Sequence, residues 1–167
     1  MIYKHIPDVR VKAKFSDCKK FRYQLTIENK LIENGTALCV LMQNPSIADD
    51  KIADKSVQFL ETLIFHKNYP EFEKVSHFTI VNQFARIQTK DFEGKDKDIG
   101  PDNDLYIRKA IQQSNIILIA WGKSNPYSKR QQDILSMITS FERKKVFMTK
   151  KHPSRGTYHD FLRPFKN

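Results

Sequence analysis

Four short polar clusters, each directly after an apolar run, contain the residues of this chain that are able to do chemistry. The clusters are Gln43-Asn44-Pro45-Ser46, Asn82-Gln83-Phe84, Trp121-Gly122 and His152-Pro153-Ser154. A side-chain amide offers a donor and an acceptor side by side, so it can pair with a planar polar group or orient a water molecule. His152, flanked by Lys151 and Arg155, can donate a hydrogen bond to an oxygen that becomes negatively charged. These residue types predict a site that binds a polar group and stabilises a developing anion.

Hydrophobic patterns predict the strands and helices that position these clusters. Nearly continuous apolar segments are typical of strands covered on both faces, and apolar residues at helical spacing indicate helices. The expected strands are Phe21–Asn29, Thr36–Met42, Val75–Val81, Asn115–Ala120 and Lys145–Met148. Three helices are expected: one capped by Asp54 and ending near Lys67, one with Pro101 in its first turn, and one capped by Ser128. Asn34-Gly35 separates the first two strands and predicts a hairpin between them.

The alternation of strands and helices predicts an α/β fold. We expect a three-layer α/β/α domain with a central, mostly parallel four-stranded sheet and an N-terminal hairpin. Ligands of such sheets bind outside the carboxyl ends of the strands, and each polar cluster follows a carboxyl end. The clusters are therefore expected to meet in one cleft. Taken singly, each cluster also has the composition of an ordinary turn after a strand, because Asn, Pro, Ser and Gly favour turns.

The composition predicts one domain that spans residues 1–167 and binds a polyanion. A hydrophobic content of 40% supports a packed core and excludes a disordered chain. Lys and Arg number 29 and Asp and Glu 19, which leaves a net charge of +10. Two cysteines cannot complete a four-cysteine metal or iron–sulfur site, and no apolar run approaches the roughly 18 residues of a membrane helix. We therefore expect a soluble, cytoplasmic monomer that has no membrane segment and needs no metal or cofactor.

The ordered set of motifs resembles the uracil-DNA glycosylase superfamily. LMQNPS, VNQF, IAWG and KHPS follow one another within the stretch from Thr36 to Arg155. That superfamily carries a motif of the type GQDPY or GINPG after its first central strand, an Asn that reads uracil, a strand ending in WG, and a C-terminal HPS loop. The chain also resembles a bacterial family of unknown function with an NPS-x-AD signature, which residues Asn44 to Asp49 match. The resemblance implies a uracil-DNA glycosylase-like fold.

The resemblance also implies roles for the residues that face the substrate. Asn44 matches the position that holds the attacking water, and His152 matches the His that stabilises the departing base. Gln43 and Asn82 match positions that contact the base, with Asn82 reading its Watson–Crick edge. Ser46 stands where one branch has a bulky Tyr that blocks the methyl group of thymine. Because Asn44 is an amide, it can orient a water molecule but cannot take its proton.

Residues beside the expected site are assigned to the DNA. Pro45 and Ser154 match loop positions that touch flanking phosphates, and Lys151 and Arg155 are expected to bind DNA next to them. No Phe lies between Pro45 and Ser56 to stack on the base, and the nearest, Phe59, falls inside an expected helix. Two uses are open for the nearby Asp49, Asp50 and Asp54, with helix capping or a solvated loop favoured over holding a cation or a water network.

The expected function is monofunctional excision of uracil, or of a related damaged or modified pyrimidine, from DNA. The expected partners are DNA that contains such a base and a proteinaceous glycosylase inhibitor. One alternative is a glycosylase-like protein with weak or no catalysis that binds DNA or a protein. Another is an enzyme that acts on a free nucleoside or nucleotide, which the net charge of +10 disfavours because a small substrate needs no broad basic surface.

Overall fold

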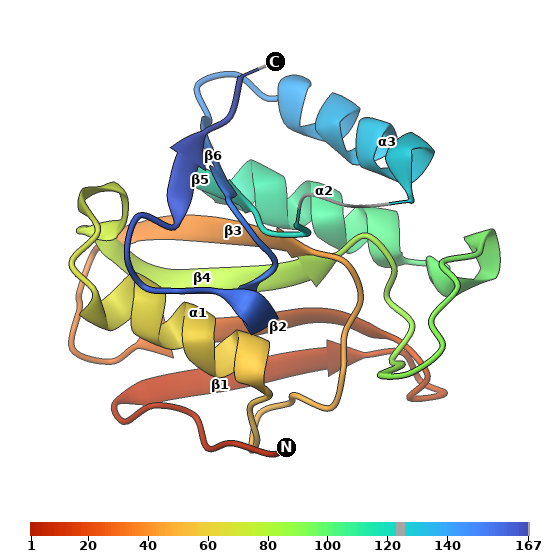
Figure 1. Cartoon of the computed structure of the whole chain (residues 1–167), viewed down its shortest axis with the longest axis horizontal. Helices are drawn as coiled ribbons and strands as arrows, with labels where there is room; N and C mark the ends of the chain where they lie inside the picture. The colour runs from red at the N-terminus through yellow and green to blue at the C-terminus, as the bar shows by residue number, and fades with distance from the viewer. Residues whose placement is uncertain (123–125, 167) are drawn as a thin grey trace.

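The computed structural model describes residues 1–122 and 126–166, and their strands form one mixed sheet (Figure 1). The sheet order is β1-β2-β4-β3-β5-β6-β7. The strands are β1 (Val9–Phe15), β2 (Arg22–Asn29), β3 (Thr36–Met42), β4 (Val75–Asn82), β5 (Ile116–Ile119), β6 (Lys145–Thr149) and β7 (Leu162–Pro164). The helices are α1 (Lys55–His66), α2 (Asn103–Gln113) and α3 (Ser128–Thr139), with short 3-10 turns η1 (Pro70–Phe72), η2 (Asp96–Asp98) and η3 (Pro153–Arg155). No helix in these described ranges is long and apolar enough to cross a membrane.

The expected three-layer α/β/α domain with a central, mostly parallel four-stranded sheet is wrong in its sheet. Within the described residues the sheet has seven strands of mixed direction. The β1–β2, β2–β4 and β6–β7 pairs are antiparallel, and β4, β3, β5 and β6 are parallel neighbours between them. β1, which was not predicted, is a half-buried strand whose apolar residues alternate with the exposed Arg10, Lys12 and Lys14. β7 is only three residues long.

The expected hairpin between β2 and β3 is also wrong, because β4 lies between these two strands. Leu25 of β2 pairs with Ala13 of β1 on one side and with Ile80 of β4 on the other. β3 is instead flanked by β4 and β5, both parallel to it. This position agrees with its sequence, because six of its seven residues are buried and all of these are apolar.

The helices begin close to the expected positions, with one different cap. Asp54 caps α1, because its side chain accepts a hydrogen bond of 2.8 Å from the backbone N–H of Val57. α2 begins at Asn103, two residues after Pro101. Ser128 is the first residue of α3 rather than its cap, and Tyr127 occupies the N-cap position.

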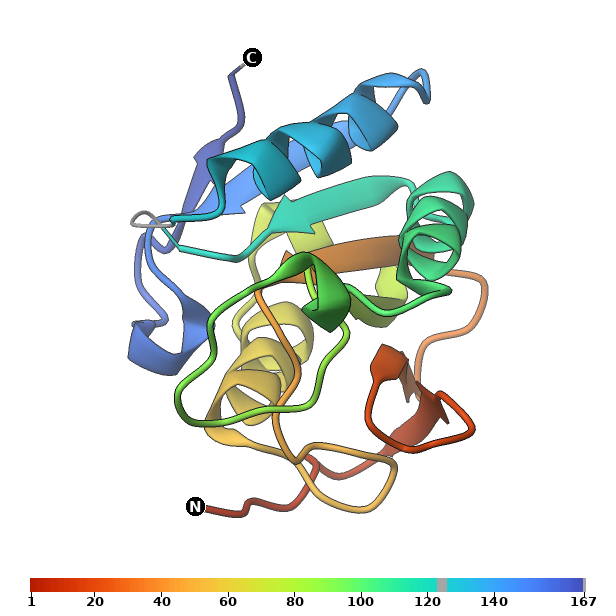
Figure 2. The same ribbon diagram turned by 90° about the vertical axis from the view of Figure 1, so that its right-hand side faces the viewer.

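The parallel strands end at one edge of the sheet, which Figure 2 shows together with the segment after β3 and the η3 turn. Met42 of β3 pairs with Asn82 of β4, so these two strands end side by side. β5 and β6 run in the same direction, with Ile119 opposite Met148. The segments that follow β3, β4 and β6 therefore start from the same edge.

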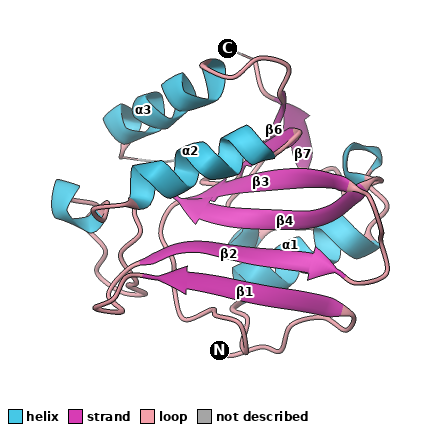
Figure 3. Cartoon of the chain, turned by 180° about the vertical axis from the view of Figure 1, so that it is seen from behind, coloured by secondary structure: helices cyan, strands magenta, loops and turns pink. Residues whose placement is uncertain are grey.

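Helices cover both faces of the sheet around β3. Val40 of β3 packs in one apolar cluster with Leu60 of α1. Its neighbour Leu41 points to the opposite face and packs with Ile111 of α2 and Ile134 of α3. Figures 1 and 3, which view the chain from opposite sides, show α1 on one face and α2 and α3 on the other.

Candidate functional site

A cavity of about 680 Å³ opens at the sheet edge where β3 and β4 end. This volume lies within the roughly 300–1,000 Å³ typical of ligand sites, and it exceeds what one pyrimidine base requires. Eight of the predicted site residues line the cavity, namely Gln43, Asn44, Pro45, Ser46, Asn82, His152, Ser154 and Arg155. Lys151, the ninth, is exposed and is not part of the wall. Tyr3, Arg22, Asp54 and Gln88 also line the cavity.

The Trp121-Gly122 cluster supports the cavity without lining it. Trp121 is buried in the apolar cluster formed with α2 and α3. Gly122 has a φ of +88°, and a Cβ added to it would lie 3.4 Å from the Cβ and the backbone N of His152. The strand end after β5 therefore sets the position of His152. Three of the four predicted clusters contribute residues to the cavity wall.

Asn44 has its amide nitrogen bound to the backbone. Its Nδ2 donates to the carbonyl oxygens of Gln88 at 2.7 Å and of Pro45 at 3.3 Å. Its Oδ1 accepts a hydrogen bond of 3.4 Å from Nε2 of Gln43. An amide oxygen has two lone pairs, so Oδ1 retains the capacity to accept from a water molecule. This geometry is suited to orienting water.

Asn82 presents an unsatisfied acceptor at the end of β4. The residue is only 1% exposed, yet its Oδ1 has no hydrogen-bond partner among residues 1–122 and 126–166. Its backbone oxygen accepts a bond of 2.9 Å from Nδ2 of Asn103, which fixes the strand end. Leaving a buried acceptor unpaired costs about 1–3 kcal/mol. Asn82 lines the cavity, and a ligand N–H that reached Oδ1 would relieve this cost.

His152 is arranged to present a neutral N–H donor. Its Nδ1 accepts a hydrogen bond of 3.2 Å from the backbone N–H of Ser154 and lies 2.8 Å from Oγ of the same residue. Because Nδ1 accepts, the proton of the neutral ring is on Nε2. Burial and the positive charge of Arg155 lower the pKa of His152, against the opposing effect of Asp54. The imidazole is therefore neutral at physiological pH and able to donate from Nε2.

The range that matches a known protein family includes most of the residues described above. The family described as a protein of unknown function, DUF1643, matches residues 22–159. The chain belongs to the DUF1643 family. The matched range contains every predicted site residue of this DUF1643 chain, whereas Tyr3 and His5 precede it. No curated protein and no solved structure matches the chain.

Three charged residues that line the DUF1643 cavity were not predicted as site residues, namely Arg22, Asp54 and Lys55. Arg22 is 2% exposed and donates from an Nη to the backbone oxygen of Ala48 at 2.6 Å. Burial lowers the pKa of Arg22 to about 10, although the carboxylates of Asp54 and Asp49 oppose the shift. Arg22 is the first residue of a strand with a mixed pattern, so nothing in the sequence marked it. Asp54 is bonded through its second carboxylate oxygen to the hydroxyl of Ser46.

No group suited to metal binding accompanies these residues. In the parts of the DUF1643 chain that the structure describes, no three His, Cys, Asp or Glu side chains gather as a metal site requires. Phe59, the Phe nearest to the predicted base-binding loop, is buried and stacks on Tyr158 with ring centroids 4.7 Å apart. It is therefore engaged in packing α1 against the segment after η3. Tyr3 is an aromatic residue that does line the cavity.

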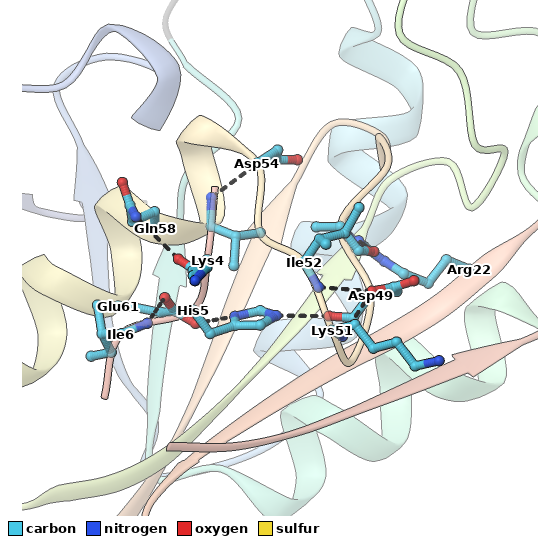
Figure 4. A network of polar contacts seen from close by, with 12 residues as sticks. Lys4, His5, Ile6, Arg22, Asp49, Lys51, Ile52, Asp54, Gln58 and Glu61 are labelled. Carbon is cyan, nitrogen blue, oxygen red and sulfur yellow. Dashed lines mark hydrogen bonds and ion pairs between the residues drawn. The ribbon is translucent and has the colours of Figure 1, made fainter. Parts of the chain in front are cut away.

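His5 connects the N-terminal segment to the loop between β3 and α1 (Figure 4). One ring nitrogen of His5 lies 2.5 Å from the buried carboxylate of Glu61, and the other lies 2.8 Å from the backbone oxygen of Asp49. Both neighbours are acceptors, so both ring nitrogens donate and the ring is an imidazolium. Two backbone hydrogen bonds of 2.9 Å join Tyr3 to Ala53 next to this contact. His5 thereby holds Tyr3 and the loop before α1 together.

The contact of His5 predicts a pH-dependent stability. Burial alone would lower the pKa of His5, but the hydrogen bonds and charges of Glu61 and Asp49 outweigh it and raise the pKa. The stabilisation is therefore fully present below the unfolded pKa of about 6.5 and is lost as pH rises through the folded pKa. We expect His5→Gln to lower the free energy of unfolding by about 2 kcal/mol at acidic pH, and by less at alkaline pH.

Urea unfolding of wild type and His5→Gln across this pH range measures the effect. His159→Gln, which makes the same change at an exposed histidine, is the matched control for the substitution. A stability difference for His5→Gln that stays constant or grows with pH would contradict the assignment of an imidazolium.

Proposed function

We propose that this protein hydrolyses the N-glycosidic bond of uracil, or of a related modified pyrimidine, in DNA, as a diverged relative of the uracil-DNA glycosylases. The observation that carries the proposal is that Asn44, Asn82 and His152, from three separate segments, line one cavity. Asn44 offers an acceptor for water, Asn82 an acceptor for a ring N–H, and His152 a donor for the departing base. This reaction needs all three.

Asn82 is the residue that selects the base. Uracil presents a carbonyl at O4 and an N–H at N3, which match the amide Nδ2 and Oδ1 of Asn82. The buried Oδ1 of Asn82, which has no partner among the described residues, supports this pairing, because uracil N3–H supplies the donor that those residues do not. Cytosine presents an amino group and a bare ring nitrogen in these places, so both partners are reversed. Ser46 is small, which leaves room for a modified pyrimidine.

His152 acts on the leaving group. When the C1′–N1 bond breaks, its electron pair moves into the pyrimidine and negative charge develops on the base oxygens, while the sugar becomes oxocarbenium-like. A fixed neutral N–H at Nε2 of His152 stabilises that charge more than it stabilises the uncharged base. The hydrogen bond from Ser154 to Nδ1 holds the ring in the donating tautomer.

The basic surface binds the DNA from which the base is extruded. Arg155 lines the cavity and is exposed, and exposed Lys151 lies four positions earlier in the same segment. Pro45 and Ser154 both line the cavity, and their loops touch the flanking phosphates. Extruding a base costs a few kcal/mol, which is smallest for a mispaired or single-stranded base. The net charge of +10 supplies a sequence-independent attraction toward the phosphates.

Excision from an oligonucleotide with one uracil tests the proposal. The wild-type protein should release free uracil and leave an abasic site that alkali cleaves, whereas a thymine- or cytosine-containing strand of the same sequence should stay largely intact. Single strands and uracil–guanine mispairs should be cut faster than uracil–adenine pairs. Binding of these strands without release of any base would contradict the proposal and favour a non-catalytic DNA-binding protein.

A further inference from the structure

The proposed reaction produces a proton that Asn44 cannot accept. Water that attacks C1′ must lose a proton, and an amide side chain is not a base at neutral pH. We propose that Asp54 is the catalytic base that receives this proton, an inference that rests on the function proposed above. Asp54 lies ten positions after Asn44 and lines the same cavity.

The contacts of Asp54 hold its carboxylate in a fixed orientation. Oδ1 accepts a hydrogen bond of 2.8 Å from the backbone N–H of Val57 at the start of α1. Oδ2 is bonded to the hydroxyl of Ser46, which itself belongs to the loop that carries Asn44. Each carboxylate oxygen has two lone pairs, so one acceptor direction on each oxygen remains. The carboxylate is half-buried, and it can therefore meet a water molecule inside the cavity.

The charges around Asp54 suit a base that works beside a departing anion. The guanidinium of Arg22 is buried in the same wall and attracts the Asp54 carboxylate. The carboxylate also interacts electrostatically with His152, so the base and the leaving-group donor act in one cavity. A carboxylate in this place additionally stabilises the positive charge that develops on the sugar.

The reaction is balanced with Asp54 in this role. The C1′–N1 bond breaks and its electron pair goes to the uracil, while the water oxygen forms a bond to C1′. One proton of that water moves to the Asp54 carboxylate, and its second proton stays on the new hydroxyl of the abasic sugar. The uracil anion then takes a proton from solvent, and protonated Asp54 returns its proton to solvent.

A capping role alone would not require a charge at Asp54. Asn and Ser cap helices about as well as Asp does, so substitution by either preserves the start of α1 while removing the base. Asp49 offers a matched control. Its carboxylate also faces Arg22 and binds the backbone N–H groups of Lys51 and Ile52, but it does not line the cavity.

The experiment compares uracil release by wild type, Asp54→Asn, Asp54→Ser and Asp49→Asn in single-turnover reactions. Loss of a general base lowers rates by about 10²–10⁴-fold. We expect at least a 100-fold loss, in line with that range, for both Asp54 variants, and a change of less than about threefold for Asp49→Asn. Urea unfolding of the Asp54 variants should resemble that of Asp49→Asn, because the helix cap is retained and each variant removes one carboxylate that attracts Arg22.

The outcomes separate this inference from the proposed function. If wild type releases uracil and the rate of Asp54→Asn lies within threefold of the wild-type rate, the role of Asp54 is overturned and the proposed function is left intact. No release of uracil by wild type would overturn the proposed function itself. Adding Asn44→Asp to Asp54→Asn should restore part of the lost rate, because it returns a carboxylate to the water site.

Discussion

His152→Ala is expected to lower uracil release by about 10²–10³-fold, the effect of removing one donor that faces a developing oxyanion. Affinity for the uracil-containing strand should stay within a few-fold of wild type. The reason is that the Nε2–H of His152 gains its full strength only when the base carries negative charge. Single-turnover release and equilibrium DNA binding, measured on the same oligonucleotide, separate the two effects.

The hydrogen bonds of His152 supply a graded control. Ser154→Ala removes the hydroxyl that lies 2.8 Å from Nδ1 but leaves the backbone N–H that fixes the tautomer. Its rate should therefore fall much less than that of His152→Ala. Equal rates for wild type and His152→Ala would refute the role of His152 in departure of the base.

Asn82→Ala is expected to lower uracil release by at least about 10²-fold, because a site built to hydrogen-bond its substrate discriminates by several kcal/mol. The variant removes the buried acceptor that would bind N3–H. The backbone oxygen of residue 82 keeps its hydrogen bond from Nδ2 of Asn103. The measurement is the single-turnover rate on single-stranded DNA, where extrusion of the base contributes least.

Gln83→Leu is the matched control for Asn82→Ala. Gln83 is the next residue in the chain, fully buried, and its side-chain nitrogen and oxygen have no partners in the described parts of the chain. It does not line the cavity. Replacing an unpaired buried amide by an apolar group of similar size costs little, so stability and uracil release should both persist. If Asn82→Ala released uracil at the wild-type rate, Asn82 would be only a turn residue at the end of β4 and would not read the base.

The sequence predicted the cavity better than it predicted the sheet. The apolar β3 and β4 require neighbours on both sides, and because both strands are parallel their polar ends had to share one edge. The Asn44 and Asn82 clusters were therefore placed together correctly, and His152 joined them through β6. The pairing of β2 was missed because its alternating pattern fits either β3 or β4 as neighbour. β1 was missed although its apolar residues alternate with charged ones, a pattern typical of a half-buried strand.

The cavity roles of Tyr3, Arg22 and Asp54 were missed for one reason. Each depends on contacts with residues that are distant in sequence. Tyr3 reaches the cavity because His5 binds Glu61, which lies 56 positions away. Arg22 reaches it because the backbone of Ala48 folds back over the start of β2. Asp54 was recognised as a helix cap, which is correct, but its pairing with Ser46 across the loop was not visible in any local pattern.

The most direct test of whether this cavity recognises and excises uracil is the ratio of cytosine release to uracil release. This ratio is measured for wild type and for Asn82→Asp. A carboxylate at residue 82 accepts from the amino group of cytosine but repels the O4 carbonyl of uracil. Wild type should release uracil and spare cytosine, and Asn82→Asp should release less uracil and gain measurable release of cytosine. An unchanged ratio in Asn82→Asp, with uracil still released, would contradict the account, because the base would then be selected somewhere other than Asn82.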